Sequence, residues 1–308
     1  KGEAYADFSR VDFARILHRI GFGNIVRTGT GAARTWVSFD SGRITRLLSD
    51  INLSKEHAQI APELEKLNLS SLSGRVAYSE DADGMHFRAE RLAFQHGLNG
   101  SRFGPATMTA DCVKNAADDV SSCNFEASEV SIGTLAKIAS SLPLPHDALA
   151  FLSERPISGI LQEASASFHS DYKNPSNWSF AGVFRGITIP PGEDGFPGIR
   201  NLSGSVLTNT PGEFDISLDM HYGALYFPGV FRNPQLNITS LTGRVKASIH
   251  SEVSLSFEDI KVANDDLSAR AAGTWKNSGG AGTIDIAGSV ERGTGTSVIK
   301  YLPNVIGD

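Results

Sequence analysis

The acidic residues between Ser79 and Glu90 are the group whose types and spacing come nearest to a metal site. Asp81, Asp83, Gly84 and Glu90 fall at positions 3, 5, 6 and 12 of a calcium-binding loop. Position 1, however, is Ser79 instead of aspartate, and the flanking residues alternate like strands rather than like helices. A hairpin that turns at Asp83-Gly84 therefore accounts better for this stretch, and we predict no metal site there.

Nucleophilic catalysis has one partial match in the chain. Ser297 and Lys300 have the S-x-x-K spacing of serine acyl enzymes, but the companion S-D-N and K-T-G sequences are missing. The eight histidines include no H-E-x-x-H pair, and no G-x-S-x-G sequence occurs. We therefore expect a protein that is not an enzyme, with no catalytic residue, no metal and no cofactor.

The composition excludes several classes of function. The chain has 308 residues, a formal net charge of -6 and 40% hydrophobic residues, so it is long and apolar enough to fold. An acidic balance argues against a nucleic-acid partner, which needs basic clusters. No run of 18 apolar residues occurs, and the sequence starts at Lys1. We interpret it as a fragment of a longer protein.

Cys112 and Cys123 are the two cysteines of the chain. They flank the turn-rich stretch 115–119, and the runs 106–112 and 123–130 could form the two strands of one hairpin. Cysteines that pair across a hairpin suit an oxidising compartment, so we predict a disulfide. Two reduced cysteines beside a loop remain the alternative.

Apolar and polar residues alternate with a period of two over most of the chain, which is typical of strands with one apolar and one wet face. Turn sequences such as Pro211-Gly212 and Ser278-Gly279-Gly280 separate these runs, which favours antiparallel meanders. In the C-terminal half the alternation places these side chains on one face: Phe214, Ile216, Leu218, Met220, Tyr222, Val245, Ala247, Ile249, Val253, Leu255, Phe257, Ile284, Ile286 and Val290.

Three stretches have a helical pattern instead. Val11 to Gly21 follows Ser9 as a cap, Ser131 to Leu142 carries a second apolar stripe, and Lys55 to Leu67 is a shorter candidate because Pro62 interrupts it. The first two stretches occupy equivalent places in a duplicated unit of about 120 residues. We therefore divide the chain into residues 1–125, with an N-terminal helix, and 126–308, with a helix near 131–142, as parts of one continuous array.

A short phrase recurs along the chain. Leu72-Ser73-Gly74-Arg75-Val76 returns at 202–206 and 241–245, with weaker copies at 157–160 and 286–290. The gaps between its glycines are 85, 45, 39 and 45 residues, and 85 is about twice the others. A period near 40 residues indicates stacked supersecondary units, which build long surfaces rather than compact pockets.

The order of these phrases resembles that of the YhdP proteins, within the AsmA-like superfamily. The stretch 195–205 (GFPGIRNLSGS) is similar to the family's PGF-x-x-LSG phrase, except that Ile199 replaces an aromatic residue. The stretches 141–145, 156–159, 178–184, 226–231, 241–245, 262–267, 271–275 and 301–303 follow in the family's order. The clear resemblance covers residues 128–303, and the first 120 residues share it only through the weaker duplication.

The resemblance implies a lipid-transport protein of the Gram-negative cell envelope. Proteins of this family are similar to bridge-like lipid-transfer proteins with a repeating β-groove. They are anchored in the inner membrane and are thought to carry phospholipid across the periplasm in outer-membrane biogenesis. We therefore expect this chain to be a periplasmic segment, with phospholipid acyl chains and other segments of the same full-length chain as partners. A disulfide fits that compartment.

Elementary physics leads to a similar expectation. Sheets with an apolar face must bury it, and too few long helices are predicted to cover so many strands. The predicted fold class is mainly β: elongated, curled antiparallel β-sheet repeats that form an apolar groove, with two or three short helices. The candidates for lining the groove are Phe214, Ile216, Leu218, Met220, Val245, Ile249, Val253, Leu255, Phe257, Ile284 and Ile286. The alternative is a scaffold module with a closed, dry core that binds partner proteins.

Overall fold

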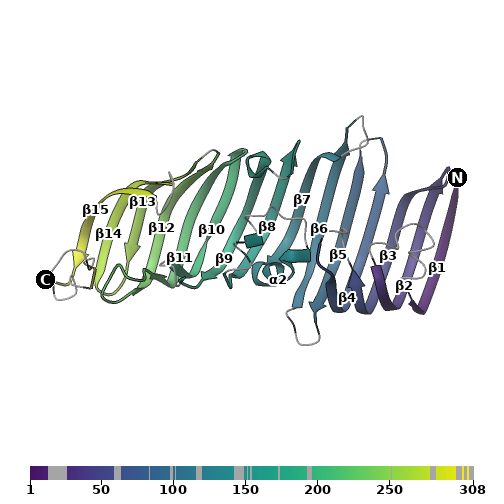
Figure 1. Ribbon diagram of the computed structural model, residues 1–308, viewed down its shortest axis with the longest axis horizontal. Helices are drawn as coiled ribbons and strands as arrows, with labels where there is room; N and C mark the ends of the chain where they lie inside the picture. The colour runs from purple at the N-terminus through teal and green to yellow at the C-terminus, as the bar shows by residue number, and fades with distance from the viewer. Residues whose placement is uncertain are drawn as a thin grey trace. The chain divides into compact units, whose positions relative to one another are not determined.

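A computed structural model gives the structure of the chain (Figure 1). It describes residues 1–12, 26–58, 64–82, 84–97, 100, 102–115, 120–141, 149–150, 152, 155–172, 174–192, 196–250, 252–277, 282–295, 300–301 and 304.

Antiparallel strands make up most of the described residues, which confirms the mainly β prediction. The strand order is the order of the sequence, from β1 to β15, so each strand pairs with its neighbours along the chain. The first and last strands are not paired with each other, and the sheet is therefore open. The strands are β1 (Gly2–Asp12), β2 (Val26–Asp40), β3 (Arg43–Ala58), β4 (Leu67–Glu80), β5 (Met85–His96), β6 (Arg102–Lys114), β7 (Val120–Ser131), β8 (Ser158–His169), β9 (Trp178–Ile189), β10 (Gly198–Thr210), β11 (Glu213–Tyr226), β12 (Gln235–Ile249), β13 (Val253–Ala263), β14 (Leu267–Asn277) and β15 (Thr283–Gly293).

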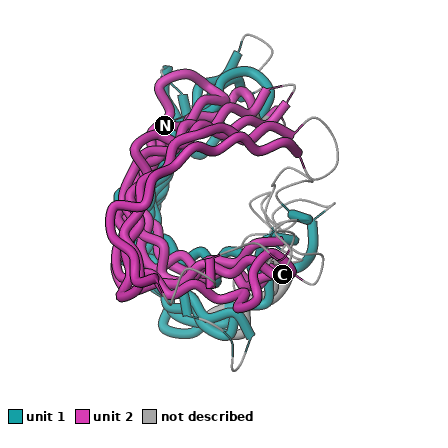
Figure 2. The backbone as a smooth tube through the Cα atoms, turned by 90° about the vertical axis from the view of Figure 1, so that its left-hand side faces the viewer, with its two compact units in different colours: residues 1–153, 163–173 teal, residues 154–162, 174–308 magenta. Residues whose placement is uncertain are grey.

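The chain is divided into two compact units. Unit 1 comprises residues 1–153 and 163–173, and unit 2 comprises residues 154–162 and 174–308. In Figure 2 the strands of unit 2, drawn in magenta, follow a pronounced arc. The division of the array predicted from the sequence stays a prediction.

One α-helix with defined ends lies in unit 1. Helix α2 (Ile132–Lys137) follows β7, and the Ser131 hydroxyl caps it by accepting a hydrogen bond from the Thr134 backbone N–H. The Thr134 hydroxyl in turn donates to the Arg102 carbonyl at the start of β6, at 3.3 Å. A 3-10 turn, η1 (Ala139–Ser141), continues the chain, and Ser140 there hydrogen-bonds to Glu65. Helix α2 thus packs against the ends of β6 and β7.

The predicted helices agree only in part with the structure. The helix predicted over Ser131 to Leu142 exists but is shorter, because it ends at Lys137. The helix predicted over Lys55 to Leu67 is wrong at both ends, because 55–58 belong to β3 and residue 67 begins β4, while 59–63 lie outside the described residues. Of the helix predicted from Val11 to Gly21, the first two residues are the end of β1, and 13–21 lie outside the described residues.

The hairpin predictions are confirmed. Strands β4 and β5 form a hairpin around 81–84, where the calcium-loop spacing occurs, and the Asp81 N–H donates to the Gly84 carbonyl at 3.0 Å. Strands β6 and β7 place Cys112 directly opposite Cys123, and the two form a disulfide with both residues buried. The disulfide joins the two strands near the loop that connects them.

The glycines of the recurring phrase mark a longer structural repeat. Gly74, Gly159 and Gly243 are 85 and 84 residues apart and lie in β4, β8 and β12, one in every fourth strand. Each adopts a φ between 133° and 150°, a region that side chains disfavour. The stronger repeat therefore spans four strands, and the period near 40 residues corresponds to about two.

Gly74 and Gly243 each lie against a register shift in the next strand. At Gly243 the register between β12 and β13 shifts, and Asp259 on β13 has a φ of 48°. A Cβ at Gly243 would lie 2.8 Å from the Ile260 Cα, so only glycine admits the close approach. Arg91 opposite Gly74, at φ 50°, repeats this arrangement. Such β-bulges bend a strand and increase its twist, so we infer that they set the curvature of each unit.

Candidate functional site

Alternate residues of β11 differ sharply in exposure. Phe214, Ile216 and Leu218 are half-buried and Met220 is buried, whereas the intervening residues 215, 217 and 219 are exposed. The alternation predicted from the sequence is thus confirmed from Phe214 to Met220. Tyr222 breaks it and corrects the prediction: it has a φ of 55°, which reverses the pattern, and its side chain is 80% exposed.

The strand register joins these residues into rows that cross unit 2, because residues opposite each other in a ladder share a face. We call the surface made by two such rows the apolar face. The first row is Phe214, Ala247, Leu255, Trp275 and Ile284, one residue from each of β11 to β15. The second row is Ile216, Val245, Phe257, Gly273 and Ile286.

The structure brings the predicted groove residues together. Phe214, Ile216, Val245, Leu255, Phe257, Ile284 and Ile286 lie in the two rows. Ile249 and Val253 face each other at the end of β12 and β13. Leu218 lies between the second row and Met220, opposite Gly243. Their role in holding a ligand stays a prediction.

Exposure along the apolar face changes from one part to another. Met220 is fully buried, at 0% exposure, in a cluster with Ile238 and Leu241, so it offers no surface to a ligand. At β15 the exposed fractions of Ile284 and Ile286 rise to 62% and 52%. The rows therefore run from partly shielded positions on β11 to open ones on β15.

Sequence reasoning missed an aromatic extension of the first row. Trp178 and Phe180 on β9 stack at 5.7 Å between ring centroids, and Phe180 lies 6.1 Å from Phe214. Trp275 on β14 was also missed. The period-two spacing could have identified them. Trp178 and Phe180 are two residues apart, and Trp275 follows Ala271 and Gly273 at intervals of two, so each set shares one face of its strand.

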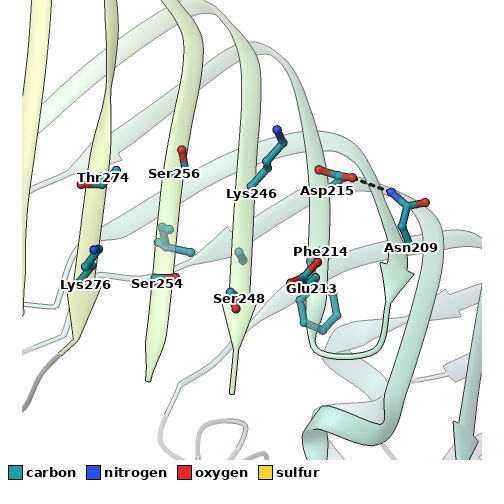
Figure 3. A pocket seen from close by; sticks show the side chains of 12 residues that line it. Asn209, Glu213, Phe214, Asp215, Lys246, Ser248, Ser254, Ser256, Thr274 and Lys276 are labelled. Carbon is teal, nitrogen blue, oxygen red and sulfur yellow. Dashed lines mark hydrogen bonds between the residues drawn. The ribbon is translucent and has the colours of Figure 1, made fainter. Parts of the chain in front are cut away.

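The opposite face of the same strands is polar. Asp215 accepts a hydrogen bond from the Asn209 side-chain amide at 2.7 Å, and Figure 3 shows this pair beside Lys246. The Lys246 ammonium lies 2.9 Å from Glu258, and this hydrogen-bonded pairing raises the pKa of Lys246 above its usual value. A hollow of about 510 Å³ at β10 to β14 is lined by charged, amide and hydroxyl-bearing residues together with Phe214, Ala247 and Leu255 of the first row.

Within the part of the chain that the structure describes, no three His, Cys, Asp or Glu side chains are grouped so that they could hold a metal ion. Among the same residues, no helix has the length and apolar character needed to cross a membrane.

Comparison with known proteins adds the family. The family model described as YhdP protein matches residues 1–307. The chain belongs to the YhdP family. That family is part of the AsmA-like superfamily, so the match confirms the resemblance and extends it over the first 120 residues. No curated protein and no solved structure matches the chain.

Membership of the YhdP family gives the apolar face a context. The family and the buried disulfide together favour a segment of a cell-envelope protein with a role related to lipid transport. The apolar face of this YhdP-family chain offers side-chain contact without hydrogen-bonding groups, as hydrocarbon binding would require.

Proposed function

We propose that this chain is a non-enzymatic, periplasmic segment of an envelope protein of a Gram-negative bacterium. It binds phospholipid acyl chains on the apolar face and conducts them between the inner and outer membranes. The anchor in the inner membrane and the other segments of the path belong to other parts of the full-length chain. One observation carries the proposal: apolar side chains from five consecutive strands lie in register on one face.

The energetics favour hydrocarbon as the ligand. Each methylene removed from water contributes about 0.8 kcal/mol, so an acyl chain with a dozen methylenes in contact is held firmly. Strands lie about 4.8 Å apart, and a row that crosses five of them extends over about 19 Å. Since Val, Ile, Leu and Phe side chains impose no hydrogen-bonding register, an acyl chain could slide along the row.

A pair of substitutions on one strand tests the proposal. Phe257→Glu places a carboxylate in the second row of the apolar face, whereas Ser256→Glu places the same charge one residue away on the polar face. We expect Phe257→Glu to weaken binding of a fluorescent fatty acid by about tenfold or more, because an acyl chain beside it would desolvate the charge. Ser256→Glu should bind like the wild type.

Circular dichroism and the urea midpoint of each variant establish that it is folded. Equal affinities of the wild type, folded Phe257→Glu and Ser256→Glu would contradict a role of the apolar face in lipid binding. Equal weakening by both substitutions would contradict it as well, since the effect would then follow total charge and not the face.

A scaffold module is the second candidate, and the cluster around Met220 favours it. Met220, Ile238 and Leu241 are 0%, 5% and 6% exposed, as in a dry core. In this function the apolar residues stabilise the fold alone, and the polar surfaces or the sheet edges bind partner proteins. An apolar dye such as an anilinonaphthalene sulfonate separates the two functions, because a dry core excludes it and an open apolar face binds it.

A further inference from the structure

One face of unit 1 carries a row of charged residues and, beside it, an exposed apolar row. Tyr5 on β1 is paired in register with Trp36 on β2, and Trp36 with Leu48 on β3. The two rings lie 5.2 Å apart between centroids with 45° between their planes. Tyr5 is 56% exposed and Trp36 is 39% exposed, while Leu48 is half-buried. We call these three residues the aromatic patch.

The surroundings of the aromatic patch make it unusual. The neighbouring row on the same face is an ionic ladder across five strands, in which Asp7, Arg34, Asp50, Arg75 and Glu90 alternate in sign. Isolated exposed apolar residues are ordinary on a protein surface, but here three occupy adjacent register positions on a charged face, which makes this row a candidate interaction site. Trp, Tyr and Arg are also the residue types that contribute most to binding hot spots.

The ladder residues beside the patch are held in place. The Arg34 guanidinium donates to Asp7 at 3.1 Å, and Tyr5 donates to the same carboxylate at 3.2 Å. The Arg75 guanidinium binds Asp50 through two hydrogen bonds of 2.6 and 2.9 Å, which keeps the pKa of Asp50 below its usual value. These two ion pairs hold the side chains along one edge of the patch. Because each charge is neutralised by its partner, this edge has no unpaired charge to offer a ligand.

The other rim carries charges that the ladder does not neutralise. Glu3 on β1 and Arg46 on β3 both lie opposite Ser38, in the row on the other side of the aromatic patch. Among the described residues, neither makes an ion pair or a side-chain hydrogen bond. A ligand lying along the patch from β1 to β3 would therefore meet a carboxylate at one end and a guanidinium at the other.

The dimensions match a polyproline II helix. Residues three apart in this helix are separated by about 9.3 Å. The patch crosses two interstrand spacings, or about 9.6 Å. Two prolines in a P-x-x-P sequence would therefore lie over the β1 and β3 ends of the patch, and proline-rich segments characteristically dock on exposed aromatic side chains.

We propose that the aromatic patch is a docking site for an extended, proline-containing polypeptide segment. The segment carries a basic residue that pairs with Glu3 and an acidic residue that pairs with Arg46. This site lies on unit 1, uses the face that does not carry the disulfide, and is independent of lipid binding by unit 2.

The probe is a synthetic peptide with the sequence Ala-Arg-Pro-Ala-Ala-Pro-Glu-Ala that carries a fluorescent label at one end. The purified 308-residue chain is titrated into it, and binding is followed by the fluorescence anisotropy of the label. Trp36→Ala should weaken binding by about tenfold or more, as truncation of a hot-spot residue does. Phe39→Ala is the matched control, because Phe39 lies on the same strand, is 41% exposed and is on the other face. It should leave peptide affinity unchanged.

Two further peptides complete the test. Replacing both prolines by alanine, or exchanging the arginine and the glutamate, should each weaken binding several-fold. Equal binding of all three peptides, equal loss in Trp36→Ala and Phe39→Ala, or no measurable binding of the first peptide would overturn the proposal. Binding of an N-acetylglucosamine oligomer through Trp36 in place of the peptide would also overturn it, by assigning the patch to a glycan.

Discussion

His86, at the start of β5, shows how single residues on the charged face of unit 1 join neighbouring strands. Its Nδ1 lies 2.6 Å from Asp111 on β6, and its Nε2 lies 3.5 Å from Asp81 in the turn before β5. The hydrogen bond with Asp111 and the pairing with Asp81 raise the pKa of His86 above its usual value. The protonated imidazolium therefore stabilises this hairpin against β6.

We predict a pH dependence of stability from this raised pKa. The contribution of protonated His86 is fully present below its unfolded-state pKa of about 6.5 and is lost as the pH rises through the higher folded-state pKa. The urea midpoint of the wild type should therefore fall more than that of His86→Gln between about pH 6 and pH 9. Parallel curves for the two proteins would show that His86 does not contribute in this way.

At the scale of residues, much of the candidate site follows from the sequence. The period-two alternation of Phe214, Ile216 and Leu218 identifies their shared face because side chains of a strand alternate strictly. The alternation does not show the register between neighbouring strands. That register places Met220 opposite Leu241, where both side chains are buried. The alternation also gives no reason to single out Tyr5, since an exposed aromatic residue is recognised only once Trp36 is known to lie beside it.

At the scale of elements, we attribute the curvature within each unit to the glycine–bulge pairs. Gly243 and Asp259 adopt backbone conformations that most residues avoid, and neither conformation is encoded by an apolar pattern. The sequence shows that the motif recurs. It does not show that the Gly74 and Gly243 copies lie opposite register shifts in the neighbouring strands.

Gly243→Ala should destabilise the chain strongly. The new Cβ would meet the Ile260 Cα at 2.8 Å in a backbone conformation with φ of 147°, so strain and overpacking together should cost about 2–4 kcal/mol. Gly42→Ala is the control, because Gly42 has a φ of 81° with open space around it and should cost only about 1–2 kcal/mol. Urea denaturation measures both; equal losses would refute the close-approach explanation.

The failed helix prediction at Lys55 to Leu67 has a physical cause at the same scale. Residues 56–58 continue the β3 ladder and pair with 67–69 of β4. Backbone hydrogen bonds to two neighbouring strands outweigh a short helical pattern, because intrinsic propensities differ by only fractions of a kcal/mol per residue.

At the scale of the whole molecule, family membership and the apolar face lead to the same conclusion. The YhdP family match covers residues 1–307, and in-register rows of apolar side chains cross β11 to β15. Ile284 and Ile286 are exposed, as is every residue of β15, and they continue the two apolar rows onto the last strand of the sheet. On these grounds we propose that this segment holds acyl chains.

Native mass spectrometry of the chain purified from a bacterial host, followed by lipid extraction, tests that claim most directly. We predict phospholipid that remains bound to the folded chain, or that binds when phospholipid is added to a stripped sample. A folded chain with a lipid-free mass that also fails to take up added phospholipid would contradict the account and favour the scaffold function.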